Sequence, residues 1–140
     1  MAQHFFAYGT LIVPSVMQAV CGTSYQFTAA SLDGYTRFAL KGKSYPAIVK
    51  DADSMVDGIL YLDIDNEALK RLDYFEGKEY QRVVVQPALE SGKKVEAFTY
   101  LLSPAHAALL TNQPWNLKKF KDSELDQYLK NARQAMRDFR

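Results

Sequence analysis

Cysteine and histidine are nearly missing from this sequence, which limits the chemistry that it can support. Its 140 residues include one cysteine, Cys21, and two histidines, His4 and His106. One cysteine cannot form an internal disulfide, and this usage is typical of a reducing compartment. Two histidines without a cysteine cluster or an acidic ligand spacing do not favour a metal site, so we expect none. Cys21 is either a nucleophile assisted by one of these histidines or, as its apolar neighbours favour, a buried small side chain.

An excess of charge of one sign and long hydrophobic runs are missing as well. The net charge is +1 and charged residues make up 24% of the chain, so nothing points to nucleic acid or to an anionic membrane. No apolar run approaches the ~20 residues that span a bilayer. The first residues, MAQHFFAYGTL, lack the basic region and cleavage site of a signal peptide. We therefore expect a cytoplasmic protein that binds neither nucleic acid nor membrane.

The glycine-rich motifs that bind phosphates are also absent. The sequence contains neither G-x-G-x-x-G nor G-x-x-x-x-G-K-[ST], so a nucleotide cofactor is not supported. Apolar side chains, in contrast, are abundant, because 48% of the residues are hydrophobic and 13% are aromatic. This supply and this length predict a single domain over residues 1–140, built around one core.

The apolar segments of the chain predict an α+β fold. Segments typical of strands are QHFFAY, SYQFTAASL, YTRFALK, PAIVK, MVDGILYLDI, RVVVQPAL and VEAFTYLL. Turn signals separate several of them, notably Asp33-Gly34 and Ser91-Gly92, and Pro87 indicates a sheet edge or a bulge. Strands and helices do not alternate regularly. We therefore expect a small, mixed, mostly antiparallel barrel-like sheet of about six strands with helices packed outside it.

Three stretches are typical of helices. The first opens at Pro14, where the missing N–H of proline costs nothing. The second covers residues 66–76, with Asp65 or Asn66 as its cap and Gly77 as its stop. The third lies in a C-terminal helical extension, residues 103–140. There a stripe at spacings of three and four indicates a helix that begins at Asp122 or Ser123: Leu125, Leu129, Ala132, Met136 and Phe139.

Glu76 is the most unusual acidic residue of the sequence. Leu69, Leu72 and Glu76 follow the i, i+3, i+7 spacing of one helix face. At about 100° per residue, Glu76 projects within ~20° of Leu69 and thus toward the core. Since a buried carboxylate is costly unless it is paired, Glu76 indicates either an ion pair, for example with Arg82, or an acid/base group in a pocket. Glu79 is less unusual, because it follows the break at Gly77 and can turn to solvent.

The segment FAYGTL, residues 6–11, is the second unusual feature. Gly9 follows an aromatic strand, and the chain then turns toward a helix. Such a turn can present consecutive backbone N–H groups to an anion, and glycine lets a ligand approach the main chain closely. The alternative is an ordinary turn that ends the strand, and the turn alone does not decide between the two.

The order of four motifs is more specific than either feature alone. FAYGTL, YPAIV, GILYLD and LDYFEGKEYQRVVV follow one another along the chain. On these motifs, the sequence from about Phe5 to Leu102 resembles the gamma-glutamylcyclotransferase-like family, including its plant avirulence-induced-gene branch. The combination of Tyr-Gly-Thr-Leu with Leu-Asp-x-x-Glu-Gly-x-x-Tyr-x-Arg carries this resemblance.

The resemblance implies a fold, a reaction and a set of site residues. Members of the family fold as a small mixed barrel with flanking helices. The family's catalytic acid/base matches Glu76, and its substrate-binding loop matches Tyr8, Gly9, Thr10 and Leu11. In the implied reaction, the free α-amine of a gamma-glutamyl amide attacks the γ-carbonyl and releases 5-oxoproline with an amine or amino acid. This small-molecule reaction requires no metal, nucleotide or covalent enzyme intermediate, so we expect no cofactor.

Tyrosines near these motifs are further candidates. Tyr45 could close over the site from the loop that precedes Pro46, and Tyr100 could point inward from the last predicted strand. For both residues, and for Tyr80, the alternative is a buried ring with a satisfied hydroxyl group. Arg82 is expected to be an ion-pair partner rather than a substrate ligand.

The same residues are compatible with two rival functions. The first is a non-catalytic module that binds a gamma-glutamyl compound or a protein partner. The second is a hydrolase that uses Glu76 to activate water. The sequence identifies neither the leaving group nor the oligomeric state.

Overall fold

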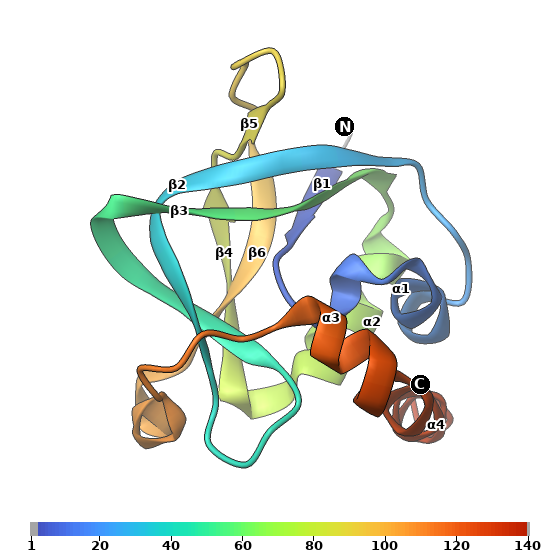
Figure 1. Ribbon diagram of the computed structural model, residues 1–140. Helices are drawn as coiled ribbons and strands as arrows, with labels where there is room; N and C mark the ends of the chain where they lie inside the picture. Colours follow the sequence, from blue (N-terminus) through green and yellow to red (C-terminus); the bar gives the residue numbers. More distant parts are fainter. Residues whose placement is uncertain (1–2, 140) are drawn as a thin grey trace.

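The computed structural model describes residues 3–139 and contains one six-stranded sheet with its α-helices gathered on one side (Figure 1). The strands are β1 Gln3–Ala7, β2 Phe27–Ala39, β3 Pro46–Ile64, β4 Tyr80–Val85, β5 Ala88–Leu89 and β6 Ala97–Leu102. Their order in the sheet is β4-β6-β1-β3-β2-β5. Only the β1–β6 pairing is parallel among these residues. The predicted α+β fold is therefore confirmed, although the sheet curls without closing, since β4 and β5 lie at opposite ends of the order.

The long β2–β3 hairpin corrects one prediction. The Asp33-Gly34 pair does not reverse the chain, because β2 runs through it as one continuous strand. The register shifts between Asp33 and Tyr35, so that residues 51–54 of β3 lie opposite Gly34. Gly34 has a φ of 84°, which suits the irregular backbone of a β-bulge as well as a turn. Both strands bend across the molecule (Figure 1).

Two predicted helices form where the sequence indicates them. Helix α1, Pro14–Cys21, begins at the proline. Helix α2, Asn66–Glu76, is capped by Asp65, whose carboxylate accepts a hydrogen bond of 2.8 Å from the N–H of Ala68. The helix ends at Gly77, which has a φ of 64°. These boundaries place the side chain of Glu76 in the last turn of α2.

The C-terminal helix starts earlier than the sequence predicts. Helix α3, Leu117–Lys119, continues through a π-helical turn, Phe120–Glu124, into α4, Leu125–Met136. The side chain of Asn116 caps this helix by accepting a hydrogen bond from the N–H of Lys119. Asp122 and Ser123 lie inside the π-helical turn and not at a cap. Asn116 is as good a cap as either residue, and burial of Phe120 against Trp115 extends the helix upstream.

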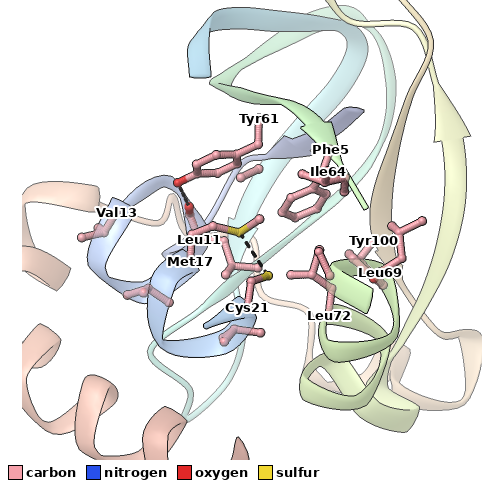
Figure 2. Close-up of a cluster of buried hydrophobic side chains, with 14 of the residues drawn as sticks. Phe5, Leu11, Val13, Met17, Cys21, Tyr61, Ile64, Leu69, Leu72 and Tyr100 are labelled. Carbon is pink, nitrogen blue, oxygen red and sulfur yellow. Dashed lines mark hydrogen bonds between the residues drawn. The ribbon is translucent and has the colours of Figure 1, made fainter. Parts of the chain in front are cut away.

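The main core lies between β1, β3 and the helices (Figure 2). Phe5 packs on the ring of Tyr61, and the hydroxyl of Tyr61 donates to the carbonyl oxygen of Leu11 at 2.6 Å. Cys21 is 7% exposed and lies beside Met17 in this cluster, and burial raises the pKa of its thiol to about 12. The thiol is therefore protonated and buried, which supports the structural interpretation of Cys21 over the nucleophilic one.

A second apolar cluster occupies the other face of the sheet. Successive residues of a strand point to opposite faces, so Phe5 joins the helix-side core while Phe6 and Tyr8 join the second cluster. Leu32 and Val56, from the β2–β3 hairpin, complete its centre. The end of β1 is thus held from both sides. Among residues 3–139, no helix combines the length and the apolar character that crossing a membrane requires.

Candidate active site

A cavity of about 300 Å³ lies where the end of β1, the end of α2, strand β6 and helix α4 meet. This volume is in the range of small-molecule sites. The structure brings together at this cavity every residue that the sequence predicts for the site. These residues are Tyr8, Gly9, Thr10, Leu11, Tyr45, Glu76 and Tyr100. Tyr8 and Tyr100 are 92 residues apart in the sequence, so it is the fold that brings these residues together.

Glu76 lines this cavity as a half-buried carboxylate without a structural partner. No ion pair or hydrogen bond joins its side chain to another residue within 3–139. Arg82, the partner considered from the sequence, pairs with Asp73 at 3.3 Å instead. Burial, followed by the negative charges of Glu79 and Asp73, raises the pKa of Glu76 from its ordinary value of 4.5 to about 8. The carboxyl group can therefore gain or lose a proton near neutral pH.

This raised pKa predicts a pH-dependent difference in stability between the wild type and Glu76→Gln. The folded state holds a proton between about pH 4.5 and 8 that the unfolded state has released, so the stability of the wild type falls as pH rises through this window. We expect its free energy of unfolding, relative to the variant, to fall by about 1 kcal/mol per pH unit there. Urea denaturation of both proteins at several pH values measures this difference. Parallel stability curves would contradict the raised pKa.

The substrate-binding loop predicted from the sequence, Tyr8–Leu11, is a tight turn that leads into a short 3₁₀ helix, Thr10–Ile12. The carbonyl oxygen of Gly9 accepts a hydrogen bond of 3.0 Å from the N–H of Ile12. A Cβ atom at Gly9 would lie 2.8 Å from Cδ of Pro46, so only glycine fits without displacing the proline ring. The N–H groups of Gly9, Thr10 and Leu11 find no acceptor in the described part of the chain, which leaves them available to a ligand.

Neighbouring residues hold this loop in place. The guanidinium group of Arg37 donates to the carbonyl oxygens of Tyr8, at 2.7 Å, and Asp57, at 3.0 Å. The hydroxyl of Tyr8 donates to the carbonyl oxygen of Tyr100 at 2.6 Å. Together with the hydrogen bond from Tyr61 to Leu11, these contacts fix the loop at both ends. A turn held in this way can bind a ligand without first being ordered.

The tyrosine hydroxyls around the cavity have structural partners. Tyr45 donates to Oε1 of Glu79 at 3.0 Å, and Tyr100 donates to Oδ1 of Asp73 at 2.7 Å. Tyr80 donates to the carbonyl oxygen of Pro46 at 2.7 Å. Glu79, which the sequence leaves free to turn to solvent, is half-buried instead. The 3₁₀ turn Gly77–Glu79 after α2 directs it toward Tyr45 and into the cavity wall.

Helix α4 contributes cavity residues that were not predicted as site residues, although Ala132 belongs to the predicted buried stripe. Tyr128, Asn131, Ala132 and Ala135 line the cavity. Their i, i+3, i+4, i+7 spacing places them on one helix face, so the signal was present in the sequence. This spacing is hard to recognise because the more apolar stripe through Leu125 and Leu129 dominates the segment. Thr10 Oγ1 donates to the hydroxyl of Tyr128 at 3.0 Å and links α4 to the Tyr8–Leu11 loop.

The charge of the cavity wall limits what it can do. Two carboxylates, Glu76 and Glu79, line the cavity, and no lysine, arginine or histidine does so among the described residues. Within residues 3–139, no group of three or more histidine, cysteine, aspartate or glutamate side chains is arranged to hold a metal ion. An anionic part of a ligand would therefore be bound by N–H and hydroxyl donors. Glu76 can exchange a proton with a titratable group of the same ligand.

Comparisons with known proteins agree with this architecture. Residues 5–117 match the family described as "Gamma-glutamyl cyclotransferase, AIG2-like". AIG2-like protein D of Arabidopsis thaliana is 30% identical over 131 residues, which are 92% of this chain and 86% of that protein. AIG2-like protein C of the same plant is 36% identical over 101 residues, 71% of this chain and 59% of that protein.

Solved structures share the fold. A solution structure of an Arabidopsis thaliana protein has a TM-score of 0.69 at 27% identity, covering 97% of this chain and 91% of its own. A gamma-glutamyl cyclotransferase has a TM-score of 0.68 at 15% identity, covering 94% and 86%. At that identity, the second likeness shows the fold alone. The match over residues 5–117, which includes the Tyr8–Leu11 loop and Glu76, shows that the chain belongs to the gamma-glutamyl cyclotransferase, AIG2-like family.

Proposed function

We propose that this protein is a gamma-glutamyl cyclotransferase, which converts a gamma-glutamyl amide into 5-oxoproline and a free amine or amino acid. One observation carries the proposal: Glu76, a carboxyl group without an ionic partner and with a pKa of about 8, opens into the same cavity as the Tyr8–Leu11 loop. Membership of the family and the fold shared with a gamma-glutamyl cyclotransferase support it.

The reaction requires one proton to move between two nitrogen atoms. The α-ammonium group of the substrate must lose a proton before its nitrogen attacks the γ-carbonyl carbon, and the leaving nitrogen must gain one as the C–N bond breaks. A single carboxylate near both nitrogens can accept the first proton and deliver it to the second. The raised pKa of Glu76 suits this task, because it lies close to the ordinary pKa of an α-amino group, about 8.

The remaining requirements are orientation and stabilisation of charge. The substrate must be bent so that its amine approaches its own γ-carbonyl carbon, and holding that geometry supplies much of the acceleration. The N–H groups of Gly9, Thr10 and Leu11 can hold the glutamyl end in the proposed complex. A negative charge also develops on the γ-carbonyl oxygen during the attack, and fixed N–H or hydroxyl donors can stabilise it.

The products of the reaction test this proposal. We expect the purified protein, incubated with a panel of gamma-glutamyl amides, to release 5-oxoproline and the corresponding amine in equal amounts. The panel should contain gamma-glutamyl amino acids and gamma-glutamyl amines, because the leaving group is not specified by the features above. Mass spectrometry separates the cyclic product from glutamate by the mass of one water.

Each rival function has its own outcome in this assay. Free glutamate in place of 5-oxoproline would show a hydrolase, in which Glu76 activates water. Binding of a gamma-glutamyl amide without any product would show a non-catalytic binding module. Either result would overturn the proposed cyclisation.

A further inference from the structure

The hydroxyl groups of the cavity wall differ in whether their protons are already used. Most of them donate to an acceptor of the protein itself: Tyr8, Thr10, Tyr45, Tyr80, Thr99 and Tyr100. Two lining hydroxyls, those of Ser44 and Tyr128, donate to no acceptor among residues 3–139. A ligand in the cavity can therefore receive a side-chain O–H hydrogen bond from these two residues without breaking an existing one.

Tyr128 is the one of the two that is joined to the Tyr8–Leu11 loop. Its hydroxyl oxygen accepts the hydrogen bond from Thr10 Oγ1, and a tyrosine hydroxyl that accepts can donate its own proton elsewhere. Accepting a hydrogen bond also polarises the hydroxyl and makes it a better donor. Burial raises the pKa of Tyr128, so the proton is retained at neutral pH.

The position of Tyr128 is held by aromatic packing. Its ring makes edge contacts with Phe75, one residue before Glu76, and with Phe120 of the π-helical turn. Phe120 is buried, so it holds the ring of Tyr128 in place, while the hydroxyl of Tyr128 reaches the cavity. Helix α4 lies beyond residue 117, where the family match ends, so this wall of the cavity is not part of the matched segment.

We propose that Tyr128 is a substrate-binding residue whose hydroxyl donates a hydrogen bond to the α-carboxylate of the glutamyl group, beside the N–H of Thr10. This inference rests on the proposed function. It follows from the charge of the wall: without a cationic side chain among the described lining residues, a carboxylate needs neutral donors, and Tyr128 adds one to those of the loop.

Tyr128→Phe tests the inference, since it removes the hydroxyl and keeps the ring. Loss of a hydrogen bond to a charged group predicts that KM rises about 10- to 30-fold, with kcat within about twofold of the wild type. Tyr74→Phe is the matched control, because Tyr74 also contacts the C-terminal helical segment, through Phe139, but does not line the cavity. It should leave both constants unchanged, and an unchanged KM in Tyr128→Phe would overturn the inference.

Thr10→Val separates contact with the substrate from a merely positioning role. If Tyr128 only holds Thr10, both substitutions break the same bond and raise KM equally, which would overturn the inference. If Tyr128 contacts the substrate, Tyr128→Phe raises KM more.

Calorimetric binding of glutamate γ-methylamide to Glu76→Gln, with and without Tyr128→Phe, gives a readout that does not need turnover. Weaker binding after Tyr128→Phe supports the contact even if the wild type makes no 5-oxoproline. Unchanged binding, or no binding to Glu76→Gln, overturns it.

Discussion

Glu76→Gln is expected to lower kcat/KM for 5-oxoproline formation by about 10³-fold while the protein stays folded. The amide has nearly the shape of the carboxyl group but can neither accept the proton of the α-ammonium group nor deliver one to the leaving nitrogen. Because Glu76 has no ionic partner in the described structure, the substitution breaks no ion pair. Near neutral pH the wild type must also take up a proton at Glu76 when it folds, a cost that the amide does not have, so stability there should be retained or increased.

The matched control is Glu67→Gln, which makes the same chemical change on the same helix. Glu67 lies in the first turn of α2 with a side chain that is 60% exposed, and its pairing with Arg71 is an exposed i,i+4 contact of small value. We expect kcat/KM of this control within about twofold of the wild type. Circular dichroism and gel filtration establish that both variants are folded.

The pH dependence of the same assay gives a second readout. Below the Glu76 pKa of about 8, the ionised fraction of the free enzyme falls about tenfold per pH unit, and kcat/KM of the wild type should fall with it. The residual activity of Glu76→Gln should lack this dependence. Full activity in a folded Glu76→Gln variant would exclude the proton-transfer role, whatever the shape of the pH profile.

The parts of the fold that could be predicted are those in which local signals agree. The bounds of α2 follow from its apolar spacing, a cap at Asp65 or Asn66 and a stop at Gly77, and the structure reproduces these bounds with Asp65 as the cap. At Asp33-Gly34, in contrast, the signal is ambiguous, because a glycine with positive φ serves both a reversing turn and a bulge. Only the pairing of β2 with β3 decides between them.

In the candidate site, too, the local features could be predicted and the long-range contacts could not. The side of α2 on which Glu76 lies could be predicted because helical periodicity is local. The cavity contacts of Glu79 depend on the path of the chain after α2, and its partner Tyr45 is 34 residues away in sequence. Tyr128 meets Thr10 across 118 residues. Contacts of this kind follow from the packing of α4 beside α1 and α2, which no single segment encodes.

Gly58→Ala is expected to lower the free energy of unfolding by about 3 kcal/mol. Gly58 lies in β3 opposite Ala30 of β2, at the point where β1 crosses closely on its other side. A Cβ atom there would overlap the carbonyl oxygen of Ala7 and lie 2.8 Å from Cζ of Phe6. A main-chain oxygen in a paired strand cannot move aside as a flexible side chain does, so β1 and β3 must separate locally.

Met55→Ala is the control for this effect. It lies in the same strand, but its side chain is 55% exposed, so its removal should change stability by less than about 0.5 kcal/mol. Urea denaturation followed by circular dichroism measures both variants, and a loss below about 1 kcal/mol in Gly58→Ala would contradict the predicted clash. Since Ala7 directly precedes the Tyr8–Leu11 loop, the same displacement reaches the cavity. The folded fraction of Gly58→Ala should therefore also have a higher KM than Met55→Ala, which ties the strand pairing at Gly58 to the geometry of the proposed substrate site.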